Sequence, residues 1–273
     1  MKKRKPKSLV LFGNGINCEY ETAHAHRTVG FDVELLHINS LLEDTKKIHN
    51  YAFLNLPGGF LDGDDLGSAK AQAVRWKYQK IDGSKKRFVD ELVEFVSAGK
   101  IILGICNGFQ LLVKTGLLPG LKGEYHKQTV TLTFNDSGKF EDRWVYLKFN
   151  KFSRCIFTKD IDTIYLPVRH GEGKLVADSS NTLKEIKESG HTVMQYSDEK
   201  GFVTDEYPYN PNGSIQSIAG LCDVTGRIFG LMPHPEAFVH YTQHPRWTRE
   251  KLKEEGDGLK IFRNAYKYVV ENQ

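Results

Sequence analysis

The chain has 273 residues, of which 40% are apolar, and its net charge is +4. This length and composition allow a substantial buried core and exclude a predominantly disordered protein. The rest of the chain has a net charge of −1, because five positive charges lie near the N-terminus, on Lys2, Lys3, Arg4, Lys5 and Lys7. We therefore interpret residues 1–8 as a basic, solvated tail, expect a single domain over residues 9–273, and expect no nucleic acid among the partners.

No apolar run approaches the roughly 18 residues of a membrane-spanning helix, and no signal-peptide core follows the N-terminus. We therefore expect a cytoplasmic protein with no membrane partner. The cysteines at positions 18, 106, 155 and 222 are far apart in the sequence and form no Cys-x-x-Cys pair. In a reducing compartment this spacing argues against disulfides and against a metal site, but it leaves room for a reactive thiol.

The first half of the chain alternates short apolar strands with helices. Residues 9–12 predict a strand, residues 19–29 a helix closed by Gly30, residues 33–38 a second strand and residues 51–56 a third. Asn39 and Ser40 can cap a short helix between the last two strands, and Ser84 can cap a helix that ends at Gly99. The polar residues 70–83 indicate no clear element. This alternation predicts a parallel sheet.

The second half contains more strand patterns. Residues 129–134 and 144–149 alternate around turn residues 135–138, which predicts a hairpin, and residues 215–222 and 227–232 predict another. Residues 164–168 and 193–196 are further strands, residues 180–188 a short helix, and residues 259–270 a helix with one apolar face that includes Val270. The predicted fold class is α/β, with an open, mostly parallel central sheet, flanking helices and antiparallel hairpin additions.

Residues 104–110, with the sequence GICNGFQ, directly follow an apolar strand. Gly104 and Gly108 stand two residues before and after Cys106, a pattern that matches a nucleophile elbow with sulfur in place of serine oxygen. The start of the following helix favours a thiolate, and the amide of Asn107 can donate to a developing oxyanion. A lone cysteine after a core strand is usually a buried structural residue, and the two glycines favour the nucleophile instead.

Two other loops also follow predicted strands. Residues 57–60 (PGGF) can offer unobstructed backbone amides, although alone they would indicate an ordinary turn. In the sequence PHPE, Glu236 can orient the imidazole of His234, which would act as the base for Cys106, although a proline-rich loop commonly exposes its histidine. Together the three signals predict acyl transfer through a thioester.

One further motif, HGEG at residues 170–173, allows two interpretations. His170 and Glu172 are residue types that serve in catalysis, but a structural turn with a solvated histidine explains the local sequence equally well. The sequence itself does not favour one interpretation over the other.

The combination of GICNGFQ with the distal PHPE resembles the class I glutamine amidotransferases, which have a flavodoxin-like fold. Several other segments resemble one branch of that family, the glutaminase components of phosphoribosylformylglycinamidine synthase: residues 17–19 and 21, residues 57–60 with 63–64, and residues 116–120, 170–173, 220–223 and 226–236. The resemblance covers residues 9–268. It implies glutamine hydrolysis to glutamate and ammonia. A synthetase subunit of the same complex would use the ammonia to amidinate formylglycinamide ribonucleotide in purine biosynthesis.

The resemblance also assigns roles to individual residues. It implies that Cys106 is the nucleophile, His234 the base and Glu236 its partner, with the amides of Gly59 and Asn107 as the oxyanion hole. It further implies that the substrate is held by Gly58, Phe60 and Gln110. No cofactor is expected in this chain, since the partner synthetase would use the ATP and magnesium, and a small accessory subunit is a further candidate partner.

Three departures from the family pattern bear on the partner arrangement: residues 61–62, Ala237 and the long segment 70–86. Two alternatives to the leading hypothesis remain. One is a glutaminase that serves a different synthetase, and the other is a catalytically silent regulatory homologue.

Overall fold

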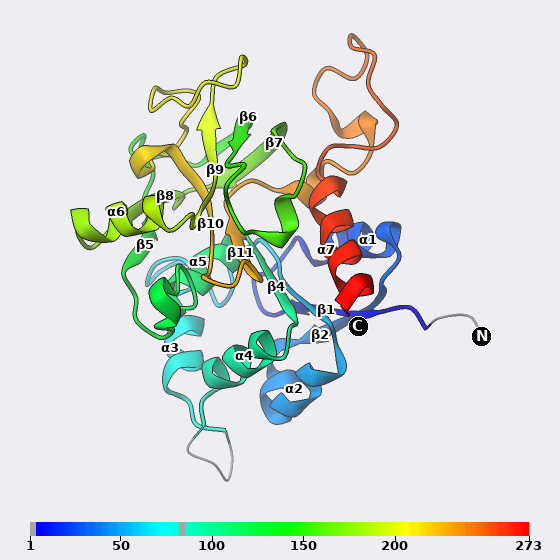
Figure 1. Cartoon of the computed structure of the whole chain (residues 1–273), viewed down its shortest axis with the longest axis vertical. Coiled ribbons are helices and arrows are strands. Elements are labelled where there is room, and N and C mark those ends of the chain that lie inside the picture. The colour runs from blue at the N-terminus through cyan, green and yellow to red at the C-terminus, as the bar shows by residue number, and fades with distance from the viewer. Residues whose placement is uncertain (1–3, 82–85, 273) are drawn as a thin grey trace.

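The computed structural model describes residues 4–81 and 86–272, and a nine-stranded sheet runs through this part of the chain. The strands follow the order β2-β1-β3-β4-β11-β10-β9-β6-β7 (Figure 1). Their bounds are β1 (Lys7–Phe12), β2 (Asp32–His37), β3 (Phe53–Leu56), β4 (Ile101–Ile105), β6 (Glu141–Phe149), β7 (Thr163–His170), β9 (Thr192–Ser197), β10 (Ile218–Cys222) and β11 (Ile228–Leu231). A separate two-stranded sheet pairs β5 (Val130–Thr133) with β8 (Lys174–Ala177).

The strands from β2 to β11 pair in parallel, and helices cover both faces of this half. These helices are α1 (Glu19–Val29), α2 (Ile38–Glu43), α3 (Lys70–Tyr78), α4 (Phe88–Ser97), α5 (Asn107–Thr115) and α7 (Leu259–Asn272), while α6 (Ser180–Glu188) contacts β8. In the strand order, β2 lies on one side of β1, and β4 lies on the opposite side of β3. The connections from β1 to β2 and from β3 to β4 therefore run in opposite directions across the sheet. Because such connections are right-handed, α1 and α4 lie on opposite faces. Accordingly α1 packs beside α7, while α3 contacts α4 and α5 (Figure 1).

The strands from β11 to β7 pair antiparallel. The predicted α/β class is therefore confirmed, with antiparallel strands added at one end of the sheet. The β10–β11 hairpin is as predicted, but the hairpin predicted over residues 129–149 is wrong, because β5 pairs with β8 and β6 pairs with β7 and β9. Alternation identifies strands without naming their partners, and here the Asn135 amide bonds to the Gly171 carbonyl instead of closing the turn.

Some predicted boundaries differ from the structure. Strand β1 already begins at Lys7, which pairs with Asp32, so the basic tail ends earlier than residue 8. Helix α2 begins at Ile38, where the Nδ1 of His37 accepts the amide of Asn39, so Asn39 and Ser40 are not its caps.

Three further differences concern the helices. The expected cap Ser84 lies outside the described residues, and α4 begins at Phe88 after an Arg87–Asp90 capping box. The unassigned polar segment forms α3. Val270 is 43% exposed and does not belong to the buried face of α7.

Among the described helices, none combines the length and apolar character that crossing a membrane requires.

The strand order brings four chain segments to one edge of the sheet. The parallel strands β1, β3, β4 and β11 are neighbours, so the loops that follow them lie at their common carboxyl ends. Those loops contain residues 13–18, the glycine loop (residues 57–60), Cys106 and His234. The sequence motifs therefore meet in one place.

Candidate active site

Cys106 occupies a strained turn between β4 and α5. Its backbone has φ 51° and ψ −102°, which is a costly conformation for a residue with a side chain. A Cβ at Gly108 would lie 2.0 Å from the carbonyl oxygen of Leu56, and one at Gly104 would lie 2.7 Å from that of Gly108. The two glycines are therefore required for close backbone packing, as the elbow pattern predicted.

His234 and Glu236 form a buried pair beside the elbow. The Nδ1–H of His234 donates to Oε1 of Glu236 at 2.6 Å, and both side chains are excluded from solvent. The connecting segment is not extended, because Glu236 lies in a 3-10 turn, Pro235–Ala237. The contact between the two side chains is as predicted, but it is the 3-10 turn that brings them together, and not an extended backbone.

The environment of His234 favours the imidazolium. Burial disfavours the charged ring, but Glu236 and the sulfur atoms of Cys106 and Cys18 outweigh this effect and raise the pKa of His234 well above 6.5. Its Nε2 is buried and has no hydrogen-bond partner among the described residues. A proton on that nitrogen is therefore available for transfer.

The two predicted oxyanion donors lie in adjacent loops. Asn107 is the first residue of α5, where backbone amides have no partner within the helix. Its side chain accepts the amide of Leu61 at 3.2 Å, which connects the elbow to the chain after the glycine loop. Gly59 has φ +142°, and its amide has no acceptor among the described residues. Both amides are therefore free to bind an oxyanion.

The residues predicted to hold substrate also lie around the elbow. A Cβ at Gly58 would lie 2.7 Å from Cε1 of His234, so this glycine lies against the His234 ring. Gln110 is buried, accepts from the Asn107 side chain at 3.0 Å and donates to the carbonyl oxygen of Glu172 at 2.7 Å. Phe60 is 41% exposed, and its ring centroid lies 6.4 Å from that of Phe140.

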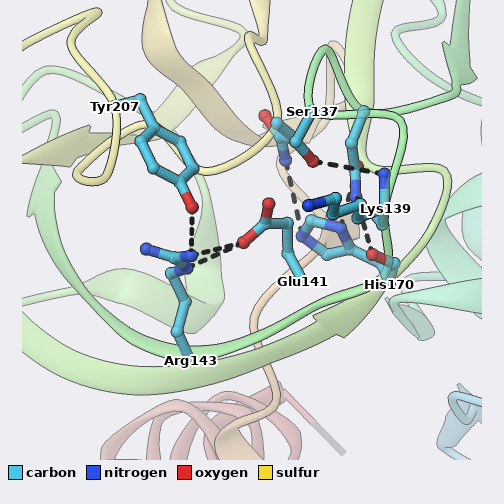
Figure 2. A network of polar contacts seen from close by, with 8 residues as sticks. Ser137, Lys139, Glu141, Arg143, His170 and Tyr207 are labelled. Atoms are coloured by element: carbon cyan, nitrogen blue, oxygen red, sulfur yellow. Dashed lines mark hydrogen bonds and ion pairs between the residues drawn. The ribbon is translucent and has the colours of Figure 1, made fainter.

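The HGEG loop (residues 170–173) is a buried structural turn next to Cys106. The Nδ1–H of His170 donates to Oδ1 of Asn135 at 3.1 Å, in the polar network of Figure 2. Burial lowers the pKa of His170 to about 3, so the ring is neutral at physiological pH. His170 is therefore neither solvated nor suited to act as a proton donor at neutral pH.

Some residues of the site gave no usable signal in the sequence. The carbonyl oxygen of Arg169 lies 3.5 Å from Sγ of Cys106. Both carboxylate oxygens of Glu172 accept the amide of Ser68 at 3.2 Å, which attaches the HGEG loop to the segment before α3. Each contact joins a side chain to a backbone group far away in the chain, so residue type alone does not reveal it.

Cys18 is the other unexpected neighbour. Its Sγ lies 4.0 Å from Nδ1 of His234, and burial raises the pKa of its thiol. Ligand atoms of Cys18, His234 and Glu236 lie within 4.8 Å of one another, and sulfur, nitrogen and oxygen are the ligands that zinc prefers. Because His234 and Glu236 already bond to each other, we interpret the group as a catalytic pair with a neighbouring thiol.

A second cluster consists of the partly exposed His49, the exposed Glu94 and the buried Glu91. There the Nζ of Lys86 lies 2.6 Å from each carboxylate and supplies the positive charge. Neither group therefore requires a metal to explain its arrangement.

Comparisons with known proteins agree with this geometry. A family model for the CobB/CobQ-like glutamine amidotransferase domain matches residues 5–269. The chain is 47% identical to the phosphoribosylformylglycinamidine synthase subunit PurQ of Dehalococcoides mccartyi, over 97% of this chain and 98% of that protein. It is 43% identical to the PurQ subunit of Methanococcus maripaludis, over 96% and 97% respectively. A chain in the structure of PurLQS from Thermotoga maritima superposes with a TM-score of 0.70 at 29% identity, covering 97% of this chain and 100% of that one.

Proposed function

The chain belongs to the CobB/CobQ-like glutamine amidotransferases and, within them, to the PurQ subunits of phosphoribosylformylglycinamidine synthase, and we propose that its Cys106, His234 and Glu236 hydrolyse glutamine. The observation that carries this proposal is the buried His234–Glu236 pair beside a cysteine in a strained elbow. A structural cysteine would need neither the strain nor a charged histidine.

The geometry supports the following reaction. The Cys106 thiolate attacks the side-chain amide carbon of glutamine, and the amides of Gly59 and Asn107 bind the resulting oxyanion. The imidazolium of His234 gives its proton to the departing nitrogen, which leaves as ammonia, and a thioester remains. The neutral imidazole then takes a proton from water, the hydroxide attacks the thioester, and glutamate leaves as the thiolate reforms.

The ammonia would pass to a synthetase subunit of the same complex. The names of the PurQ relatives and of the PurLQS complex support this partner, and a small accessory subunit is a further candidate. The synthetase would use ATP and magnesium to amidinate formylglycinamide ribonucleotide in purine biosynthesis, in the cytoplasm. This chain would need no cofactor of its own.

Two exposed aromatic rings support docking at the mouth of the site. Phe60 directly follows Gly59, and its neighbour Phe140 is 53% exposed. Aromatic side chains are enriched at protein interfaces. A partner that covered them would also enclose the site and limit the escape of ammonia to water.

The decisive test is selective labelling of Cys106. We expect an electrophilic glutamine analogue to modify Cys106 and to block glutamate production, measured with and without a candidate synthetase. A catalytically silent homologue would show no selective labelling. In a glutaminase that serves a different synthetase, Cys106 would still be labelled, but the candidate synthetase would not increase glutamate production.

A further inference from the structure

Residues 13–18 lie on the opposite side of the glycine loop from the nucleophile. Strand β3 lies between β1 and β4, and all three strands are parallel. The loops after them therefore follow the same order, with residues 13–18 on one side of residues 57–60 and Cys106 on the other. Residues 13–18 therefore contact the glycine loop from the side away from Cys106.

The start of α1 holds the carbonyl of Gly58. The Gly58 oxygen accepts the amides of Cys18 at 3.3 Å and Asn17 at 3.4 Å. In a trans peptide the carbonyl and the following N–H point in opposite directions. The amide of Gly59 must therefore point away from residues 17–18, toward the loop that carries Cys106.

The two segments also interlock through their backbones. The amide of Phe60 donates to the carbonyl of Gly15 at 2.7 Å. A Cβ at Gly59 would lie 2.7 Å from the same Gly15 oxygen, and a Cβ at Gly15 would lie 2.1 Å from the carbonyl oxygen of Phe60. Gly15 has φ +91°, so both conformation and space require glycine there. The segments therefore cannot separate or rotate independently.

We propose that residues 15–18 act as a clamp that fixes the Gly58–Gly59 peptide with its amide directed at Cys106. This proposal rests on the proposed function, because it assigns Gly15 and Cys18 as positioning residues for the oxyanion donor. Turning the peptide would break both hydrogen bonds to Gly58. The clamp thus keeps the oxyanion hole formed in the free chain.

The clamp can be tested by separating thioester formation from thiol reactivity. We expect Gly15→Ala to lower kcat for glutamine hydrolysis by about a hundredfold, the effect of losing one oxyanion donor. Alkylation of Cys106 by iodoacetamide, followed by mass spectrometry of its peptide, should keep its rate, because attack at a saturated carbon forms no oxyanion. Gly99→Ala is the matched control, since Gly99 also has a positive φ (+83°) but a Cβ there meets nothing within 4 Å.

A second pair of variants applies if Gly15→Ala does not fold. Cys18→Pro and Cys18→Ala both remove the thiol, but only proline also removes the amide that donates to Gly58. We expect kcat for Cys18→Pro to be about tenfold below that for Cys18→Ala, with equal alkylation rates at Cys106.

A failure of the clamp and a failure of the proposed function give different results. Unchanged hydrolysis in Gly15→Ala, or an equal fall in hydrolysis and alkylation, would overturn the clamp. A wild-type chain that neither hydrolyses glutamine nor reacts with its electrophilic analogue would instead overturn the proposed function.

Discussion

The imidazole of His234 lies 2.6 Å from the carboxylate of Glu236, with both groups buried. A buried carboxylate that contacts only one ring nitrogen fixes the ring orientation and supports its positive charge. The consequences of this contact can be measured separately from those of the histidine itself.

We expect His234→Ala to lower kcat for glutamine hydrolysis by about 10²- to 10⁴-fold, the usual contribution of a general acid–base group. Glu236→Gln should cost less, because the amide oxygen can still accept from Nδ1 although the charge is lost. Steady-state glutamate production measures both variants. If Glu236→Gln proved worse than His234→Ala, the roles assigned to the two residues would be reversed in importance.

Cys106→Ser should abolish synthesis that depends on glutamine but retain synthesis from added ammonium salt. The substitution removes the thiolate that accepts the acyl group and leaves the partner's site untouched. The assay measures amidine formation by the complex with each nitrogen source. Equal loss with both sources would mean that Cys106 supports assembly and not hydrolysis.

Acid should destabilise the fold between about pH 6.5 and pH 3. His26 is buried between Ser8 and Asn55, and burial lowers its pKa from 6.5 to about 3. In this window the unfolded chain binds a proton at His26 that the folded chain does not. The free energy of unfolding therefore decreases as the pH is lowered, by up to about 1.4 kcal/mol for each pH unit. The raised pKa of His234 does not contribute here, because that ring is protonated in both states below pH 6.5.

Denaturant unfolding of His26→Gln at several pH values tests this expectation. The variant should show a shallower dependence on pH than the wild-type chain. His24→Gln is the control, since His24 is an exposed histidine on the same helix. Identical slopes in His26→Gln and the wild-type chain would contradict the prediction.

Asn135→Ala should affect both stability and turnover. The Asn135 side chain accepts from His170 and Gly173 and donates to the carbonyls of Lys139 and His170. Losing these bonds should cost about 2 kcal/mol or more and release the HGEG loop, next to the Arg169 carbonyl that contacts Cys106.

Thermal unfolding and kcat measure these two effects. The control is Asn264→Ala. Asn264 lies on α7, away from the site, and donates to the carbonyls of Phe157 and Lys159, so its loss should affect stability alone. A full-rate Asn135→Ala enzyme would show that the HGEG loop does not need this anchor.

Phe140→Ser should weaken binding of the synthetase, because it removes an exposed ring at the mouth of the site. Phe152→Ser is the control, since Phe152 is 94% exposed at the start of a different loop. Isothermal titration with the synthetase compares the two variants. Equal affinities would show that the partner does not cover Phe140.

The sequence predicted the parallel half of the fold because its signals are local. Strand β4, the elbow glycines and the cap Gly30 can each be recognised within a few residues. The pairing of β5 with β8 could not be predicted in this way, since it depends on distant contacts such as the one between Asn135 and Gly171.

The same distinction applies to the site. Cys106 and the pair His234 and Glu236, to which we assign the catalytic roles, could be proposed from the sequence because such chemistry depends on side-chain type. Ser68 contributes through its backbone amide, and Cys18 contributes through its amide as well as its sulfur. Every residue except proline has such an amide. Only the fold shows which amides reach the site.

The strand order has one consequence for biosynthesis. The last strand in the sequence, β11, occupies an inner position between β4 and β10. A nascent chain that stops before residue 228 therefore has two unconnected half-sheets and lacks His234 as well. Chains that stop before residue 228, whether ribosome-bound or truncated, should consequently release no ammonia. The cell would then lose no glutamine to these unfinished copies of the enzyme.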